Sequence, residues 1–570
     1  TPSEGKSFYI DFGGLKSVSA VYFLIKNGVV NLKVYTGHPE NWSEEITDYQ
    51  QDYHYYSWKS IPLNREARFV RFVFDFSYGE IAELAALNGE GEKIAINTIK
   101  NEKGADEELL NLIDEQEKVE CPPTYMSETY FDEIYYVRAA EDYINLREPY
   151  EWTHPPLGKL IIAAAVLAFG YNPFGWRIMG VTFATLMIPV IYFFGKKMFR
   201  TWIGAFASAF LLTFDFMHFT MGRIATVDTY VVFFSLTSHF FFFVYFQEVL
   251  KRGWKASMLP LFLAVLFFAL GFSTKWYTLY GFVGQIFLLL LLRIKTFLDS
   301  KRECFARVRA FFLLLLLRVK TILTVKEGQF AQVKALFLVL SLKVKTLLTV
   351  KLGWITLVKA FFGRQFLMFL SFLAFAAVIY LLTFVPHILM GHTLKDIYEL
   401  QISMYTYHST LTATHAFSSQ WWSWPAIVRP VWFYVSYLPG DMVSTIVSMG
   451  NPAVWWVGFA SIICLVEETV RRKDYACVFV VTMFFFQWLP YVFISRCLFL
   501  YHFYFNVPFL ILATVYFLGD SWNAKRGRII CLAYLIVAAA LFVLFYPVIS
   551  GNPAPYWWRD SLKWFRGWDF

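Results

Sequence analysis

The sequence predicts a polytopic α-helical membrane protein with a small β-sandwich at its N-terminal end. Three observations predict this fold class. Hydrophobic residues make up 57% of the 570 residues and charged residues only 16%, whereas soluble domains carry roughly 25% charge. From residue 157 onward, apolar segments follow one another, each roughly 20 residues long and therefore able to cross a bilayer core. Residues 1–100 instead show short alternating runs. A large soluble enzyme, a disordered chain and a disulfide scaffold are excluded.

The N-terminal region contains four runs with the period of two that is typical of half-buried strands. They are FYIDFG (8–13), AVYFLI (20–25), NLKVYTG (31–37) and RFVRFVFDF (68–76). Gly13 and Gly14, together with polar stretches, are expected to supply turns. Residues 1–100 should therefore form a β-sandwich, and residues 101–156 a charged linker that leads into an acidic loop.

The apolar segments predict ten membrane spans. They lie near residues 176–195, 202–217, 229–247, 257–274, 277–292, 365–388, 452–469, 476–494, 498–518 and 529–549. The shorter stretch 157–170 is expected to lie in the membrane interface or to re-enter the membrane. The spans divide into a first half, 157–292, and a second half, 365–570, which includes a long loop, 389–451.

Lysine and arginine in the short loops predict the orientation, because cytoplasmic loops concentrate both residues. Four alternate connections hold three cations each, namely 195–201, 248–256, 466–475 and 520–528. These connections should face the cytoplasm. The β-sandwich, the segment 118–160 and the loop 389–451 should then face outward.

A basic and aliphatic insertion occupies residues 293–364 between two spans. The motifs LRIKT (292–296), LRVKT (317–321) and LKVKT (342–346) recur every 25 residues. Such an element would suit an anionic inner leaflet, although we prefer the reading that it is a low-complexity insertion without function. The six cysteines show no CxxC pair and no histidine at metal-ligand spacing, so neither a zinc site nor a disulfide framework is predicted.

Asp132 and Glu133 form an acidic pair just before the first span. A carboxylate in a membrane-embedded cleft can take a proton from an incoming hydroxyl, because partial desolvation raises its pKa. Taken without context, the pair is more simply an exposed feature of a loop.

Isolated cations near the outer ends of three helices form a second group of candidates. Arg223, Lys275 and Arg496 lie in MGRIATVD, STKWYTLY and ISRCLFLYHF. Such cations are costly unless they are paired, and together they could bind an anionic headgroup, with arginine contacting a phosphate through two hydrogen bonds. Asp228 is an alternative partner for Arg223, and Arg177 could merely extend to the membrane surface.

Histidines and tryptophans form a third group on the outer side. His154 precedes two prolines, and the long loop contains His408, His415, Trp421 and Trp422. The tryptophans could form only an interfacial belt. Clustered with histidine and serine, they could also stack on a sugar and bind its hydroxyls. The sequence contains no glycine-rich phosphate loop and no GxSxG motif, and we identify no DxD motif of the kind that binds a diphosphate with its metal.

Eight motifs occur in one order along the chain: FDE, HPPLGK, FGYNPFGWR, MGRIATVDTYVVFF, STKWYTLY, YHSTLTATHAFSSQWWSWP, SMGNPAVWW and SRCLFLYHF. Over residues 125–520 they resemble the dolichyl-phosphate-mannose protein O-mannosyltransferases, and the prokaryotic members in particular. The resemblance implies a GT-C membrane glycosyltransferase with eleven spans. It would move mannose from a polyprenyl-phosphate donor to Ser or Thr hydroxyls of secreted or membrane proteins, with inversion. Because ten spans are predicted, the family's first span is expected to be missing from this sequence.

The resemblance also implies roles for the candidate residues. Asp132 would be the catalytic base, with Glu133 supporting it. Contacts to the donor phosphate or lipid are expected from Arg177, Arg223, Lys275, Arg496 and His502. Contacts to the sugar or acceptor are expected from His154, His408, His415, Trp421 and Trp422. Because the donor carries an activated phosphate leaving group, no cofactor is expected to be required and no metal site is predicted; cationic side chains can stabilise the leaving phosphate.

The N-terminal region resembles discoidin-like (F5/8 type C) sandwiches over residues 1–95, in FYIDFGG, NLKVYTG, the region of Trp58 and ARFVRFVF. This resemblance implies binding of a glycan or an acceptor. A structural cap on the outer loop is the alternative.

Two other functions remain as alternatives. One is a GT-C transferase that acts on a lipid or a cell-wall glycan. The other is a transporter or structural membrane protein, which predicts duplicated spans and polar residues at mid-membrane depth; neither is seen. The expected location is the plasma membrane of a prokaryote, with the active site outside. The expected partners are polyprenyl-phosphate mannose, acceptor proteins, membrane lipids and a translocon or partner subunit, but no nucleic acid.

Overall fold

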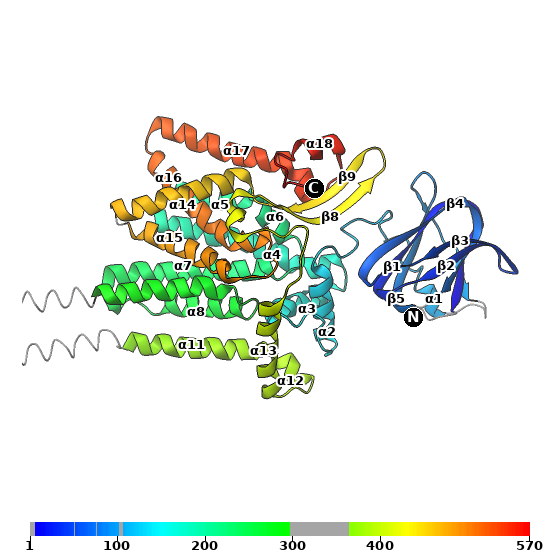
Figure 1. The fold of residues 1–570 in the computed structure, drawn as a ribbon, viewed down its shortest axis with the longest axis horizontal. Helices are drawn as coiled ribbons and strands as arrows, with labels where there is room; N and C mark the ends of the chain where they lie inside the picture. The colour runs from blue at the N-terminus through cyan, green and yellow to red at the C-terminus, as the bar shows by residue number, and fades with distance from the viewer. Residues whose placement is uncertain (1–5, 51, 76, 102–106, 297–363, 473) are drawn as a thin grey trace, which may run out of the picture.

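The computed structural model describes residues 6–296 and 364–570, apart from residues 51, 76, 102–106 and 473. A bundle of helices forms the larger part of the molecule, and a β-domain lies at one end of it (Figure 1). The predicted repeat lies outside the described residues from position 297 onward.

The β-domain is one antiparallel sheet of seven strands in the order β3-β2-β4-β1-β5-β6, with β7 paired to β1. Its strands are β1 (Ser7–Val29), β2 (Leu32–His38), β3 (Asn41–Tyr49), β4 (His54–Phe74), β5 (Tyr78–Leu87), β6 (Lys93–Ile94) and β7 (Thr98–Asn101). The inward-facing residues at both ends of β1 and β4 share one hydrophobic core. The sheet therefore folds over this core, and the predicted N-terminal sheet domain is confirmed. The discoidin-like character of the domain stays a prediction.

One expectation for this domain is wrong. The runs 8–13 and 20–25 belong to the single strand β1, and Gly13 and Gly14 do not end it. The pairing of β1 with β4 shifts register between Asp11 and Lys16 instead. A glycine with a φ of +75°, here Gly13, allows such a bulge to bend a strand without interrupting the sheet.

The helical part begins after the short helix α1 (Glu107–Leu110) in the linker. Its first half contains α2 (Glu133–Ile144), α3 (Leu157–Phe169), α4 (Pro173–Phe199), α5 (Trp202–Thr213), α6 (Phe216–Gly222), α7 (Asp228–Arg252), α8 (Leu259–Phe272) and a helix Thr278–Thr296. Its second half contains α11 (Arg364–Leu382), α12 (Val385–Leu389), α13 (Leu394–Thr410), α14 (Pro452–Arg472), α15 (Tyr475–Trp488), α16 (Val507–Ser521), α17 (Lys525–Ser550) and α18 (Tyr556–Ser561). A small sheet of β8 (Val431–Leu438), β9 (Met442–Ser448) and β10 (Ala554–Pro555) joins them.

All ten predicted spans fall on helices. Among the described residues, seven helices are long and apolar enough to cross a membrane. An eighth span is the pair α5 and α6, which bends by 60° at a short break. The spans predicted at 257–274 and 365–388 fall on α8 and α11, which are shorter apolar helices, and the stretch 157–170 is the short helix α3.

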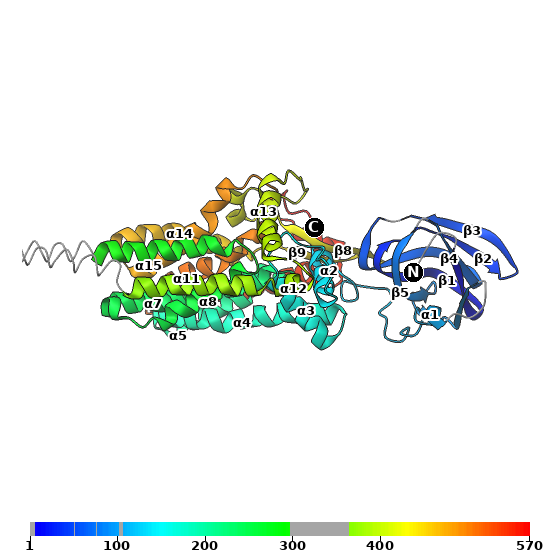
Figure 2. The same cartoon turned by 90° about the horizontal axis from the view of Figure 1, so that it is seen from below.

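The two ends of the bundle differ in chemistry. The β-domain, α2, α13 and the strands β8 and β9 gather at one end (Figures 1 and 2). All four basic connections meet away from that end, around a cavity of about 740 Å³. Each connection contributes to its lining, through Arg200, Lys251, Arg472 and Asp520 in turn. The prediction that these four connections share one side of the molecule therefore agrees with the structure.

Candidate functional site

The acidic pair lies where the linker turns into α2. Glu133 is the first residue of this helix and is completely buried. It accepts hydrogen bonds from Arg177 Nε (2.8 Å) and Nη2 (2.7 Å). Two backbone amides, of Ala225 (2.9 Å) and Tyr130 (3.2 Å), donate to it as well. Glu133 and Arg177 therefore form a satisfied buried ion pair that ties α2 to α4.

Asp132, which precedes α2, is in a different state. Its side chain is half-buried, and its carboxylate has no hydrogen-bond partner among the residues that the structure describes. Burial raises the pKa of Asp132 to about 7; Lys275 opposes this shift, while the carboxylates of Asp228 and Glu151 add to it. A free carboxyl group with a pKa near neutrality is suited to act as a general base.

Lys275, whose charge acts on Asp132, is already paired with another carboxylate. Its Nζ is 2.9 Å from each carboxylate oxygen of Asp228, and both side chains are buried. The alternative pairing of Asp228 with Arg223 is therefore wrong. Arg223 lies in the break between α6 and α7, where its guanidinium donates to the carbonyl of Ser550 and lies 4.9 Å from the ring centre of Tyr125.

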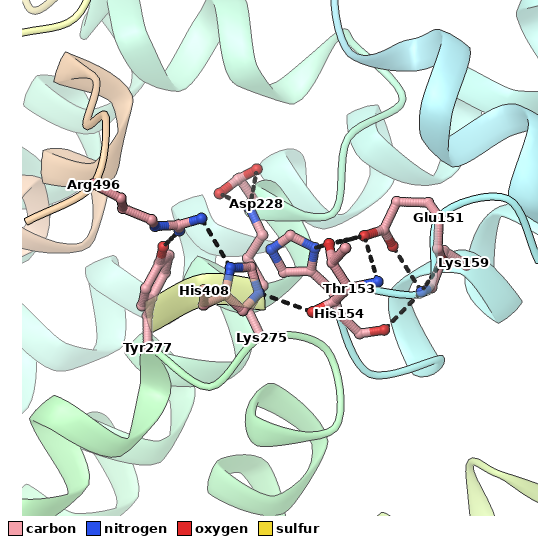
Figure 3. A network of polar contacts seen from close by, with 9 residues as sticks. All are labelled: Glu151, Thr153, His154, Lys159, Asp228, Lys275, Tyr277, His408 and Arg496. Carbon is pink, nitrogen blue, oxygen red and sulfur yellow. Dashed lines mark hydrogen bonds and ion pairs between the residues drawn. The ribbon is translucent and has the colours of Figure 1, made fainter. Parts of the chain in front are cut away.

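A separate chain of polar side chains lies near this pair (Figure 3). His154 Nδ1 lies 2.9 Å from the carboxylate of Glu151, which also accepts a hydrogen bond from Lys159 Nζ (2.7 Å). Although burial opposes it, the Lys159 ammonium holds the pKa of Glu151 well below its usual range. Glu151 is therefore an anion that orients the His154 ring.

His408, at the end of α13, connects this chain to Arg496. Its Nε2 lies 2.8 Å from the carbonyl of Thr153. A carbonyl can only accept a hydrogen bond, so this nitrogen carries the proton. Its Nδ1 is then the acceptor for Arg496 Nη1, at 2.8 Å. Burial and the charges of His154 and Arg496 lower the pKa of His408 to about 3. Arg496 is thus held by a neutral histidine and, through Nη2, by the hydroxyl of Tyr277.

These side chains open onto one cavity of about 510 Å³. Its polar wall comes from Thr153, His154, Lys275, His408 and Arg496. Its apolar wall comes from Trp276, Leu279, Tyr280, Phe493 and Ile494. Four predicted residues therefore line one cavity, although the first and the last of their motifs lie more than 300 positions apart in the sequence. A cavity lined by two cations together with aromatic and aliphatic groups can hold an anionic group that carries an apolar chain.

The other predicted residues lie around this cavity but do not line it. His502 is buried and stacks with Trp424 and Tyr501. Trp421 packs against Trp488. His415 contacts the ring of Phe499, and Trp422 is exposed. Arg177 uses four N–H groups within the protein, two of them on the carbonyls of Tyr125 and Glu128.

Glu151, Thr153 and Tyr277 belong to this site but are not among the residues predicted from the sequence. The signal was present for Tyr277, which stands inside the motif STKWYTLY, and for Glu151, three residues before the motif HPPLGK. Among the described residues, no group of three His, Cys, Asp or Glu side chains could hold a metal ion. The expectation that no cofactor or metal is required stays a prediction.

Two family models match the chain. The model described as dolichyl-phosphate-mannose-protein mannosyltransferase matches residues 167–326. The model described as the C-terminal four-TMM region of protein-O-mannosyltransferase matches residues 393–568. Together they cover both membrane halves and most of the cavity wall.

Curated relatives and a solved structure point in the same direction. The chain is 22% identical over 453 residues to the polyprenol-phosphate-mannose–protein mannosyltransferase of Mycolicibacterium smegmatis, covering 73% of this chain and 81% of that protein. It is 23% identical over 457 residues to the enzyme of the same name from Corynebacterium glutamicum, with the same coverage. A structure of the S. cerevisiae protein O-mannosyltransferase Pmt1-Pmt2 complex bound to the sugar donor aligns with a TM-score of 0.51 at 13% identity, covering 78% of this chain and 89% of that one. That likeness shows the GT-C fold. The two family models, which together match more than half of the chain, place it in the protein O-mannosyltransferase family.

Proposed function

We propose that this protein transfers mannose from polyprenyl-phosphate mannose to serine or threonine hydroxyls of proteins. One observation carries the proposal: the cavity of about 510 Å³ unites the cations Lys275 and Arg496 with an apolar wall. The carboxylate of Asp132 acts as the base beside it. Family membership and the names of the mannosyltransferase relatives support the choice of mannose as the sugar.

Arg496 is the residue best placed to bind the donor phosphate. Its side-chain partners, His408 and Tyr277, are neutral, and no carboxylate pairs with it among the described residues. A phosphate oxygen can therefore engage the guanidinium without separating an ion pair. Lys275 adds positive charge from the same wall, although Asp228 partly neutralises it. Charge-assisted hydrogen bonds of this kind are about twice as strong as neutral ones.

The apolar wall suits the polyprenyl chain. Phe493 lines the cavity and is 88% exposed, and Val492 beside it is exposed as well. Both residues follow α15, so the cavity opens beside the apolar surface of the bundle. A lipid-linked donor could enter from the membrane with its phosphate leading toward Arg496.

The chemistry then needs one proton transfer and one displacement. Asp132 accepts the proton of the acceptor hydroxyl, whose oxygen forms a bond to the anomeric carbon of mannose. The bond from that carbon to the phosphate oxygen breaks, and the electron pair leaves with the polyprenyl phosphate. Attack on the face opposite the phosphate inverts the anomeric configuration. Arg496 and Lys275 stabilise the charge that develops on the departing phosphate.

Glu133 and Arg177 affect this reaction by holding other residues of the site in place. Their mutual ion pair and the backbone contacts of Arg177 hold residues 125–133 against α4. We assign both residues a positioning role, and we assign no phosphate contact to Arg177. His154 and His408 lie on the cavity wall, where they can contact the sugar, while His415, Trp421 and Trp422 lie further out, toward an acceptor.

The protein belongs in a membrane, and we place its site on the outer face of a prokaryotic plasma membrane. The apolar helices support the membrane location, and the mycobacterial and corynebacterial relatives fit the prokaryotic one. The positive-inside rule supports the orientation, because the β-domain and the site lie away from the basic connections. A translocon or a partner subunit that delivers the acceptor is part of this proposal.

The test is transfer of labelled mannose by the purified full chain in lipid nanodiscs. Polyprenyl-phosphate mannose is the donor, and a Ser/Thr peptide, the same peptide with alanine at each hydroxyl position, and a lipid-linked glycan are offered as separate acceptors. The expected result is label on the Ser/Thr peptide alone. Label only on the lipid-linked glycan would replace the proposal with a lipid or cell-wall transferase, and no label on any acceptor would overturn it.

A further inference from the structure

The first residues of strand β4 are hydrogen-bonded to the segment that leads to Asp132. The carboxylate Oε2 of Glu128 accepts hydrogen bonds from the backbone amide of Trp58 (3.0 Å) and the hydroxyl of Ser57 (3.1 Å). The next residue, Thr129, donates from its hydroxyl to the carbonyl of Tyr55 (2.7 Å) and from its amide to the carbonyl of Tyr56 (3.0 Å). With a longer bond from the Thr129 hydroxyl to the carbonyl of Tyr56 (3.4 Å), five hydrogen bonds join two consecutive linker residues to four consecutive residues of the β-domain.

Aromatic contacts reinforce the same junction. Tyr56 has a φ of +43°, a conformation that is disfavoured for residues other than glycine. This turn places its ring at the edge of Trp176, with ring centres 4.9 Å apart, and 5.7 Å from the ring centre of Tyr171. Trp176 is completely buried on α4, directly before Arg177. The β-domain therefore contacts the helix that carries the partner of Glu133.

A second attachment lies on α2 itself. The hydroxyl of Tyr55 donates to the carboxylate of Glu141 at 2.7 Å, and Lys26 of β1 lies 3.6 Å from the same carboxylate. Tyr171, in the turn before α4, also contacts Tyr55. The β-domain is thus joined to the linker before α2, to α2 and to α4.

Residues 128–133 are therefore held from two sides. On one side β4 binds Glu128 and Thr129 through their side chains. On the other side Arg177 Nη2 donates to the carbonyl of Glu128 (2.7 Å) and binds Glu133. Asp132 lies between these two anchors, and its carboxylate has no hydrogen bond in the described part of the chain. Its position depends on the segment that carries it.

We propose that the β-domain forms part of the transfer site. Through its hydrogen bonds to strand β4, Glu128 is a positioning residue that fixes the location of Asp132. The proposal rests on the function proposed above. It assigns the β-domain to alignment of the base, in addition to any ligand that its own surface binds. Misplacing a reacting group by about 1 Å can cost a hundredfold in rate, so a modest shift of this segment is enough to affect turnover.

The test compares three variants of the full chain. Glu128→Ala removes the acceptor of both β4 hydrogen bonds. Glu128→Gln keeps an acceptor oxygen at this position and removes only the charge. Glu120→Ala is the matched control, because Glu120 is an exposed carboxylate of the same linker whose hydrogen bond goes to Thr124 within the linker. Hydrogen exchange of residues 129–137, kcat and the donor KM are measured for each.

Glu128→Ala should speed exchange in residues 129–137 and lower kcat by about ten- to a hundredfold, while the donor KM stays unchanged because the cavity wall is untouched. Glu128→Gln should return hydrogen exchange and kcat most of the way to the parental values, and Glu120→Ala should match the parent in both. Parental exchange and kcat in Glu128→Ala would overturn the proposal. If that variant does not fold, Thr129→Val, which removes the hydroxyl that donates to the carbonyls of Tyr55 and Tyr56, decides by the same two readouts. A parent chain that transfers no mannose would refute the proposed function, whereas the exchange data would still decide whether β4 fixes the segment.

Discussion

Arg177 holds the carboxylate of Glu133 with two hydrogen bonds, of 2.8 Å from Nε and 2.7 Å from Nη2. Asp132, the adjacent residue, has no hydrogen bond to its carboxylate within the described residues. Two neighbouring acids are thus in opposite states. Glu133 is a buried carboxylate paired with Arg177, and Asp132 is half-buried with no hydrogen bond to its carboxylate among the described residues.

The first prediction concerns the stability that this ion pair provides. Glu133→Ala should lower the free energy of unfolding by about 3–5 kcal/mol, because it leaves the buried Arg177 charge uncompensated. Thermal unfolding of the detergent-solubilised protein measures the loss. Glu148→Ala, which removes a carboxylate whose side chain is 70% exposed, is the control and should unfold like the parent. A Glu133→Ala variant with the parental midpoint would show that the pair is not structural.

The second prediction concerns Asp132 itself. Asp132→Asn should lower kcat by about a hundred- to ten-thousandfold, the usual range for a lost general base. The midpoint of thermal unfolding should not fall, because no hydrogen bond to the side chain is lost. Turnover of labelled mannose and thermal unfolding are measured on the same preparation. Parental turnover would remove Asp132 as the base.

The membrane part of the fold could be predicted because its signal is local. Each apolar segment is long enough to be recognised alone, and all ten predicted segments are helices. The course of β1 could not be predicted from its two runs. Gly13 and Gly14 are typical of a turn, but pairing with β4 on both sides of them continues the strand. Pairing with a distant strand is tertiary information that a local pattern does not contain.

The site shows the same division between local identity and distant partners. Lys275, His408 and Arg496 could be chosen from the sequence, since cations and histidines are rare in apolar surroundings. Arg223, the alternative partner for Asp228, does not pair with it, because that alternative requires one continuous helix through both residues. The helix α6 ends at Gly222 and α7 begins only at Asp228, so Arg223 points elsewhere and Lys275 takes its place. The position of Glu151 beside the motif HPPLGK could have drawn attention to it, but its role could not be assigned, because that role depends on contacts with His154 and Lys159.

The third prediction follows from the pKa of Asp132, which burial raises to about 7. The base must be deprotonated, so kcat should rise with pH below about 7 and level off above it. The effect on stability has the opposite sign. A carboxyl whose pKa is higher in the folded state binds its proton more tightly there, so its contribution to the free energy of unfolding falls as pH rises from about 4 to about 7.

The pH profile of kcat in a set of matched buffers measures this dependence. The residual activity of Asp132→Asn is the control and should lack the rise. A flat profile for the parent chain between pH 5 and pH 8, the range about this pKa, would contradict the assignment of the base.

The fourth prediction separates two arginines that carry the same charge. Arg496 lines the cavity and is held by the neutral side chains of His408 and Tyr277, whereas Arg223 lies over aromatic rings and does not line the cavity. Arg496→Gln should therefore raise the donor KM by about tenfold or more, the cost of one charge-assisted hydrogen bond. Its acceptor KM should stay unchanged.

Arg223→Gln is the matched comparison, because it removes an identical charge outside the cavity. Its donor KM should stay near that of the parent. Donor titrations of both variants at a saturating concentration of the Ser/Thr peptide provide the measurement. If the donor KM rose for Arg223→Gln and not for Arg496→Gln, the phosphate would bind on the side of Arg223, as the motif MGRIATVD by itself implies, and the cavity between α13 and α15 would have another role. If only the acceptor KM changed in Arg496→Gln, the guanidinium would contact the peptide and not the leaving phosphate.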